Sequence, residues 1–187
     1  MNTVITSAEA LLSASKKIAA EKGIKAISIR SVAEKANVSV GSVYNYFKNK
    51  EALISETIAD IWCDIFHNAE GCKQLDSFHD CLIWLISMID KCCSEYPDIL
   101  TAHPHSFQQK EELEKGRMMM EKYLTHIHYH LKNVLENDKK IKQGVFDDAF
   151  TMDEFIDFTF SNITLSAKNN NKNYSTLIKL IDKLLYE

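Results

Sequence analysis

The sequence lacks the features of disulfide-stabilised and membrane-spanning proteins. Its five cysteines are an odd number and form no Cys-x-x-Cys pair, which favours reduced thiols over a disulfide framework. The longest apolar run, Cys81–Ile89, is interrupted only by Ser87 and is far shorter than the roughly 20 residues that span a bilayer. No signal peptide is recognisable. We therefore expect a cytoplasmic protein with no membrane partner.

The signatures of enzymes are also missing from the sequence. It contains no nucleophile and base set, no phosphate-binding glycine loop and no dinucleotide fingerprint. No stretch alternates between apolar and polar residues as a β-strand does, whereas apolar residues recur at helical spacing along most of the chain. We predict an all-α protein that is not an enzyme and needs no cofactor.

The stretch Ser28–Leu53 contains two short amphipathic helices, a tight break and the start of a third helix. Asn37 tolerates the left-handed conformation that ends a helix, and Ser39 can cap the helix that follows. Two helices joined by so short a turn cross steeply, which predicts a helix-turn-helix whose second helix faces the DNA major groove. Ser28 is the candidate N-cap of the first helix, which carries the apolar residues Ile29, Val32, Ala33 and Ala36.

The run Val38–Leu53 also carries a family resemblance. It is similar to the recognition helix and the following helix start of the TetR family of bacterial transcriptional regulators, and the likeness extends back to about Ser7. Asn37 stands where members often have glycine, but asparagine also accepts a positive φ. The residues that carry the resemblance are Gly41, Tyr44, Tyr46, Phe47, Lys50, Glu51 and Leu53.

The resemblance implies two domains, and the charge distribution agrees with them. Residues 1–52 would form a three-helix DNA-binding domain, and residues 53–187 a larger helical bundle for ligand binding and dimerisation. The first range holds eight Lys/Arg and four Asp/Glu, a net charge of +4. The second holds 14 Lys/Arg and 22 Asp/Glu, a net charge of −8. Positive charge is therefore concentrated where DNA phosphates would be met.

Eight residues of the motif are predicted to contact DNA. Arg30 is the candidate for a bidentate contact to guanine, and Asn45 is suited to adenine. Gly41 lets the helix approach closely, at a propensity cost of up to about 1 kcal/mol relative to alanine. The alternative to DNA contact is that the charged residues are solvated side chains on the surface. Tyr46 and Phe47 are expected in the core. The remaining contacts are to base edges from Val40 and Ser42, and to phosphates from Tyr44, Lys48 and Lys50.

Sensing of a small molecule is the second function that the resemblance implies. We expect a repressor that an unidentified effector releases from its double-stranded operator. Aromatic and methionine side chains of the larger domain could surround the effector, although such side chains also form ordinary cores. The candidate pocket residues are Trp62, Phe66, Trp84, Met88, Met119, Tyr123 and His126.

The last two helices are apolar over more of their circumference than a single core-facing stripe requires. In the resembling family the corresponding helices form a four-helix bundle with those of a second subunit, which implies a homodimer. The alternative is that they complete the core of the monomer. The candidate interface residues are Phe155, Phe158, Ile163, Leu177, Ile181 and Leu184.

The spacing of several histidines allows a different class of function, metal binding. Histidine and carboxylate residues spaced three or four apart on a helix can bind metal, so the alternative is a helical-bundle metal-binding protein or metalloenzyme. A hydrogen-bonded or surface histidine is the simpler interpretation of each pair. The pairs are Asp64 with His67, Asp76 with His79, and His126 with His130.

Local signals also mark helix boundaries outside the motif. Thr6 with Glu9 and Thr151 with Glu154 are spaced as capping boxes, and Asn49 is a candidate cap. The first helix is predicted to end at Gly23. Further helices are predicted from about Asn49 to His67, over 77–95 and over 107–137, and two more follow Thr151.

Overall fold

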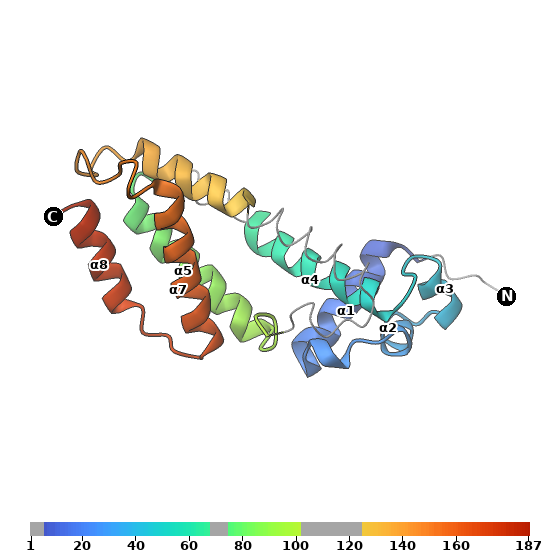
Figure 1. The fold of residues 1–187 in the computed structure, drawn as a ribbon. Coiled ribbons are helices and arrows are strands. Elements are labelled where there is room, and N and C mark those ends of the chain that lie inside the picture. The colour runs from blue at the N-terminus through green and yellow to red at the C-terminus, as the bar shows by residue number, and fades with distance from the viewer. Residues whose placement is uncertain (1–5, 68–74, 102–124) are drawn as a thin grey trace. The chain divides into compact units, whose positions relative to one another are not determined.

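All regular secondary structure in the residues that the computed structural model describes, namely 6–67, 75–101 and 125–187, is helical (Figure 1). This confirms the all-α prediction. The chain divides into two compact units, Met1–Asp64 with Cys93–Glu121, and Ile65–Cys92 with Lys122–Glu187. The predicted domains 1–52 and 53–187 stay a prediction. No helix in the described ranges is long and apolar enough to cross a membrane.

The first unit is built around four short elements and the start of a longer helix. Its core contains Leu11, Ile27, Val43, Phe47 and Leu53, which are almost completely buried. The elements are α1 (Ala8–Lys22), the 3₁₀ helix η1 (Ile24–Ala26), α2 (Ile29–Lys35), α3 (Val40–Tyr44) and α4 (Lys50–His67).

The two ends of α1 are fixed by different residue types. Ser7, not Thr6, is the N-cap, and its Oγ accepts a hydrogen bond from the backbone N–H of Ala10 at 3.2 Å. The predicted Thr6 and Glu9 capping box was therefore wrong by one residue. Gly23 ends the helix as predicted, with φ of +80°. A Cβ at Gly23 would lie 2.7 Å from Oδ2 of Asp98, so both conformation and space favour glycine.

Helices α1 and α4 are joined by buried polar contacts as well as apolar ones. The hydroxyls of Ser15 and Thr57 lie 2.7 Å apart, and both residues are inaccessible to solvent. Beside them, the Lys16 ammonium lies 2.6 Å from Asp60 and 2.7 Å from Asp64. Since Thr57 Oγ1 also donates to the Leu53 carbonyl oxygen at 2.6 Å, the buried hydroxyl pair is fully hydrogen-bonded.

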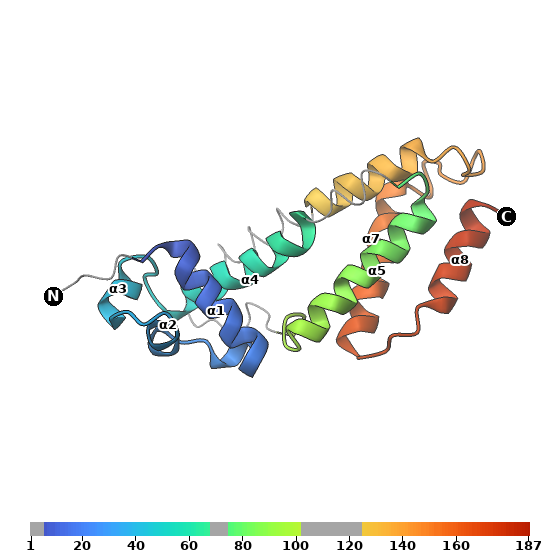
Figure 2. The ribbon, with the colours of Figure 1, turned by 180° about the vertical axis from the view of Figure 1, so that it is seen from behind.

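The second unit is a set of helices packed around α5. Helix α5 lies beside α7 in both views (Figures 1 and 2), and the rings of Phe78 and Phe155 contact across them at 5.5 Å. Tyr174, just before α8, donates to Asp90 of α5 at 2.8 Å. The described part of the predicted helix 107–137 is helical over 125–137, and the rest lies outside the described residues. The named helices are α5 (Phe78–Glu95), α7 (Met152–Lys168) and α8 (Ser175–Leu185).

One buried carboxylate, Asp138, connects the ends of several elements of this unit. It is 6% exposed, and its Oδ2 accepts from the backbone N–H of Phe78 at 2.8 Å and from the Tyr186 hydroxyl at 2.7 Å. Its Oδ1 accepts from the backbone N–H of Lys140 at 2.9 Å. Burial alone would raise the pKa of Asp138, but these three hydrogen bonds outweigh it and the pKa is lowered. Asp138 is therefore an ionised anchor at the start of α5.

Candidate nucleic-acid interface

The turn between α2 and α3 has the hydrogen bonds of a Schellman motif. The backbone N–H of Val38 bonds to the Ala33 carbonyl oxygen at 2.9 Å, and that of Asn37 bonds to Glu34 at 3.1 Å. Asn37 has φ of +53°, the left-handed conformation that this motif requires. The predicted helix stop at Asn37 is confirmed, and it brings the end of α2 directly to the start of α3.

Both helices of the motif have serine caps. Ser28 caps α2 in a capping box with Ser31, and Ser39 Oγ accepts from the backbone N–H of Ser42 at 3.0 Å. On the inner side of α3, Val43 is fully buried together with Phe47. The start of α4 is fixed by Asn49, whose Oδ1 accepts from the Ala52 N–H at 2.7 Å. The three caps predicted from the sequence are confirmed.

The outer side of this motif carries the residues that were predicted to contact DNA. Tyr44 is 54% exposed, and Ser42 is half-buried, with its hydroxyl 2.9 Å from that of Ser39. The individual DNA contacts stay predictions. Exposed with Tyr44 are Arg30, Val40, Gly41, Asn45, Lys48 and Lys50.

The fold itself gives no reason for glycine at position 41. Gly41 has no positive φ, and a Cβ there would meet only the Ser39 Oγ, at an ordinary contact distance of 3.7 Å. Glycine within a helix is unfavourable by up to about 1 kcal/mol relative to alanine. Gly41 therefore leaves the exposed face of α3 open to the close approach of another molecule.

The positive charges of the motif differ from those elsewhere in the unit. Lys16 is paired with Asp60 and Asp64, and Lys35 lies 2.6 Å from Glu21. Among the residues that the structure describes, no acidic partner is found for Arg30, Lys48 or Lys50. These three cations are available to an external anion such as a DNA phosphate.

Tyr46 is a surface residue that the sequence interpretation assigned to the core. It is 44% exposed, and its hydroxyl donates to the Thr6 carbonyl oxygen at 2.5 Å. Phe47 takes the core position because it lies four residues after Val43 on the same face. That spacing could have separated the two aromatic residues from the sequence alone.

The predicted effector pocket is only partly described. Trp62 is buried, Trp84 and Met88 are half-buried on α5, and His126 is exposed. Met119, Tyr123 and the side chain of Phe66 lie outside the described residues. The pocket therefore stays a prediction.

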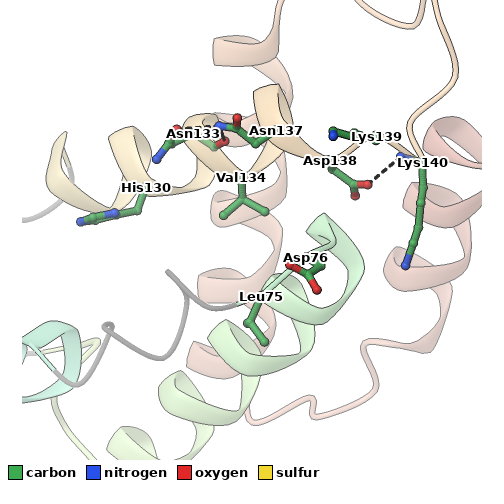
Figure 3. A pocket seen from close by; sticks show the side chains of 9 residues that line it. All are labelled: Leu75, Asp76, His130, Asn133, Val134, Asn137, Asp138, Lys139 and Lys140. Atoms are coloured by element: carbon green, nitrogen blue, oxygen red, sulfur yellow. Dashed lines mark hydrogen bonds between the residues drawn. The ribbon is translucent and has the colours of Figure 1, made fainter.

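A separate pocket of about 520 Å³ lies in the second unit (Figure 3). Polar and apolar side chains both line it, and none of the described residues of the predicted effector pocket is among them. Figure 3 shows the end of helix 125–137 on one side and the residues just before α5 on the other. Its lining consists of Leu75, Asp76, His130, Asn133, Val134, Asn137, Asp138, Lys139 and Lys140.

The residues predicted for a dimer interface divide into interior and surface groups. Phe155, Ile163 and Ile181 are almost completely buried within the second unit, and Leu177 is half-buried. Only Phe158 and Leu184 belong to the exposed apolar side chains. Two exposed residues were missed, Leu165 on α7 and Leu180 on α8.

The histidine pairs have varied environments. His79 Nδ1 lies 2.7 Å from Asp182 Oδ1, so its bond is to α8 and not to Asp76. Nε2 of His126 lies 3.0 Å from Nε2 of His130. Asp64 is bound to Lys16, and the His67 side chain is not described. Within the described ranges, no three His, Cys, Asp or Glu side chains come together as a metal site would require.

Comparison with known proteins agrees with this geometry. Residues 11–57 match the family described as "Bacterial regulatory proteins, tetR family". Over these residues the chain is therefore similar to the regulators of the TetR family. One relative, the HTH-type transcriptional repressor KstR2 of Mycolicibacterium smegmatis, is 36% identical over 50 residues, which are 27% of this chain and 24% of KstR2. An uncharacterised HTH-type transcriptional regulator of Haemophilus influenzae is 39% identical over 49 residues, 26% of each chain.

The sequence likeness to these two relatives spans about a quarter of their length. The structural similarity to solved proteins covers nearly the whole chain. The structure of the transcriptional regulator FadR from Bacillus subtilis in complex with stearoyl-CoA covers 95% of both chains with a TM-score of 0.64 and 20% identity. This confirms an N-terminal helix-turn-helix followed by a larger helical region.

Proposed function

We propose that this protein is a sequence-specific transcriptional repressor of the TetR family that binds its operator as a homodimer and releases it when a small molecule binds. The observation that carries the proposal is the exposed side of α3, where Gly41 is open and cations without acidic partners among the described residues lie nearby. Short side chains suit close approach to base edges, and the cations suit phosphates.

DNA binding is tested first with the duplex upstream of the protein's own coding region. Fluorescence anisotropy over a salt series, with random duplex as competitor, separates specific binding from charge attraction. We expect Arg30→Ala to cost roughly 1–3 kcal/mol and to loosen preference at one base pair, and Lys50→Ala to weaken all duplexes and lower the salt slope by about 1. Lys139→Ala, an exposed lysine of the other unit, is the charge-matched control.

Gly41→Ala gives the sharpest test of the proposed interface. The substitution leaves the fold intact, because its Cβ meets nothing closer than 3.7 Å, and it should stabilise α3 by up to about 1 kcal/mol. We expect the more stable variant to bind the operator at least about tenfold more weakly, since the methyl group lies on the DNA-facing side. If that duplex shows no specific binding, selection from randomised duplexes decides, and an empty selection would reject DNA recognition.

The homodimer is supported by apolar side chains that remain exposed on α7 and α8. Phe158, Leu165 and Leu180 are each more than half exposed, and Leu184 is 37% exposed. Apolar surface of this kind marks an interface in many proteins. We expect Leu180→Glu to shift the protein to a monomer in sedimentation equilibrium, whereas Lys179→Glu, at the neighbouring exposed position, should not. Monomeric wild-type protein at micromolar concentration would contradict the dimer.

The effector is proposed to be a small molecule with a long apolar part. The support is the fold shared with FadR, whose structure holds stearoyl-CoA. Stearoyl-CoA and stearate are therefore the first probes, added to the protein–operator complex in the anisotropy assay. Release by stearoyl-CoA alone indicates recognition of the CoA part, release by both indicates the chain alone, and release by neither rejects this effector class.

A further inference from the structure

Two histidine side chains on helix 125–137 converge on one point. His126 and His130 are one turn apart, and their Nε2 atoms lie 3.0 Å from each other. The ring centroids are 4.4 Å apart and the ring planes are nearly perpendicular, at 87°. Without a bound ion, one Nε2–H must donate to the other Nε2, so the two rings are in different tautomers. Nothing in the DNA-binding function uses this pair.

The separation of the two nitrogens selects among metal geometries. With metal–nitrogen bonds of about 2.0–2.1 Å, nitrogens 3.0 Å apart subtend an angle of about 95° at the metal. A tetrahedral ion would place the same two nitrogens about 3.3 Å apart. An angle near 90° is that of neighbouring positions in square-planar or octahedral coordination, which Cu²⁺ and Ni²⁺ adopt. Imidazole is also a ligand that both ions prefer.

We propose that His126 and His130 form a two-nitrogen site for Ni²⁺ or Cu²⁺. Binding needs little movement: the donating ring transfers its proton from Nε2 to Nδ1, and both Nε2 lone pairs then face the ion. In the described part of the chain no third His, Cys, Asp or Glu joins them. The site crosslinks one helical turn and is separate from the proposed DNA interface.

His128 provides a matched control on the same helix. It lies two residues from each member of the pair, and its Nε2 is 3.7 Å from a carboxylate oxygen of Asp153 and of Asp157 on α7. Replacing it removes one imidazole and leaves the converging pair intact. His126→Gln and His130→Gln remove one nitrogen each, at positions where His126 is exposed and His130 half-buried.

The experiment is calorimetric titration of the full chain, without an affinity tag, with NiCl₂ at pH 7.5. Ni²⁺ is used because it does not oxidise the thiols of Cys63, Cys81, Cys92 and Cys93, which form no disulfide. We expect one Ni²⁺ per chain for the wild type and for His128→Gln, and at least about tenfold weaker binding for His126→Gln and His130→Gln, because one-point attachment replaces chelation. Binding should weaken at pH 5.5, since only an unprotonated nitrogen can be a ligand.

Circular dichroism of each variant shows whether helix content is retained. Equal Ni²⁺ affinity in all four proteins, a loss in His128→Gln as large as in the pair variants, or no binding by the wild type would each overturn the proposal. Because the readout is metal binding alone, it is independent of whether the protein represses transcription.

Discussion

The two units hold their buried polar groups in different ways. In the first unit, caps such as Ser28 and Ser39 bond within three residues, and the deeply buried pair Ser15 and Thr57 is uncharged. In the second unit the central group is a carboxylate, Asp138, bound to partners 60 and 48 residues away in the sequence. Although Ser15 and Thr57 are 42 residues apart, the polar groups of the first arrangement carry no charge and are insensitive to pH, whereas the second arrangement depends on one charged group.

Each unit contains one of the two tryptophans, so the comparison can be measured. Trp62 belongs to the first unit and Trp84 to the second. Single-tryptophan proteins made with Trp84→Phe or Trp62→Phe therefore report the urea unfolding of one unit each. Every variant below is compared with its own single-tryptophan parent, because the background substitutions also change stability.

The largest expected effect is that of Asp138→Ala. The substitution removes the carboxylate that accepts three hydrogen bonds. The Phe78 N–H and the Tyr186 hydroxyl then lose this acceptor. We expect a loss of roughly 3 kcal/mol in the free energy of unfolding reported by Trp84. The exposed Asp148→Ala is the control and should change little. A loss below about 1 kcal/mol would mean that water replaces the carboxylate without penalty.

Acidification should produce a smaller effect at the same residue. The pKa of Asp138 is lowered in the folded protein, so its contribution is present at neutral pH and is lost as the pH falls below about 4 through that lowered pKa. The protonated carboxyl keeps part of its hydrogen bonding, so the loss is less than for the alanine variant. In Asp138→Asn the Trp84-reported stability should depend less on pH between 5 and 3. Unchanged dependence would assign the acid sensitivity to other carboxylates.

The hydroxyl pair of the first unit should cost less to disrupt. Ser15→Ala removes one partner of Thr57, whose hydroxyl keeps its bond to the Leu53 carbonyl oxygen. We expect a loss of about 1 kcal/mol in the Trp62-reported stability, with the same value at pH 7 and pH 4 because neither group is charged. Ser13→Ala on the exposed side of α1 is the control. A loss that depends on pH would contradict the proposed contrast.

The smallest expected difference comes from a feature that both units share. Asn37 and Asn170 have φ of +53° and +54°, and each ends its helix in a Schellman motif. We expect Asn37→Ala and Asn170→Ala each to cost about 0.5–1 kcal/mol in its own unit, and the glycine variants to be neutral or slightly stabilising. Unequal costs would show that the surroundings, and not the local backbone, determine these helix ends.

Local spacing explains which parts of the fold were predictable. Ser28, Ser39, Asn49 and Thr151 could be identified as caps because the bonded N–H lies three residues away in each case. The same reasoning misplaced the start of α1 by one residue, since Thr6 and Ser7 both fit. Asp138 gave no signal, because its partners lie far away in the sequence and only the folded unit brings them together.

Periodicity also could not assign the two apolar sides of α7 and α8. It groups residues on a face, but it does not tell which face meets the unit's own core. Phe155 and Ile181 therefore appeared with Phe158 and Leu184 in one predicted interface, although the first two are interior. The exposed residues of α3 were easier to predict, because Val43 is buried and leaves a single outer side, whereas their contacts to DNA stay predictions.

The long reach of Asp138 also has a consequence for the order of folding. Contacts distant in sequence form slowly, because loop closure must precede them. As the chain leaves the ribosome, the caps of α1, α2 and α3 can form as soon as each helix is synthesised. The hydrogen bond from the Phe78 N–H can form only after Asp138 is synthesised, and the second bond to Asp138 only after Tyr186. We therefore expect hydrogen exchange during refolding to protect Val43 before Phe78.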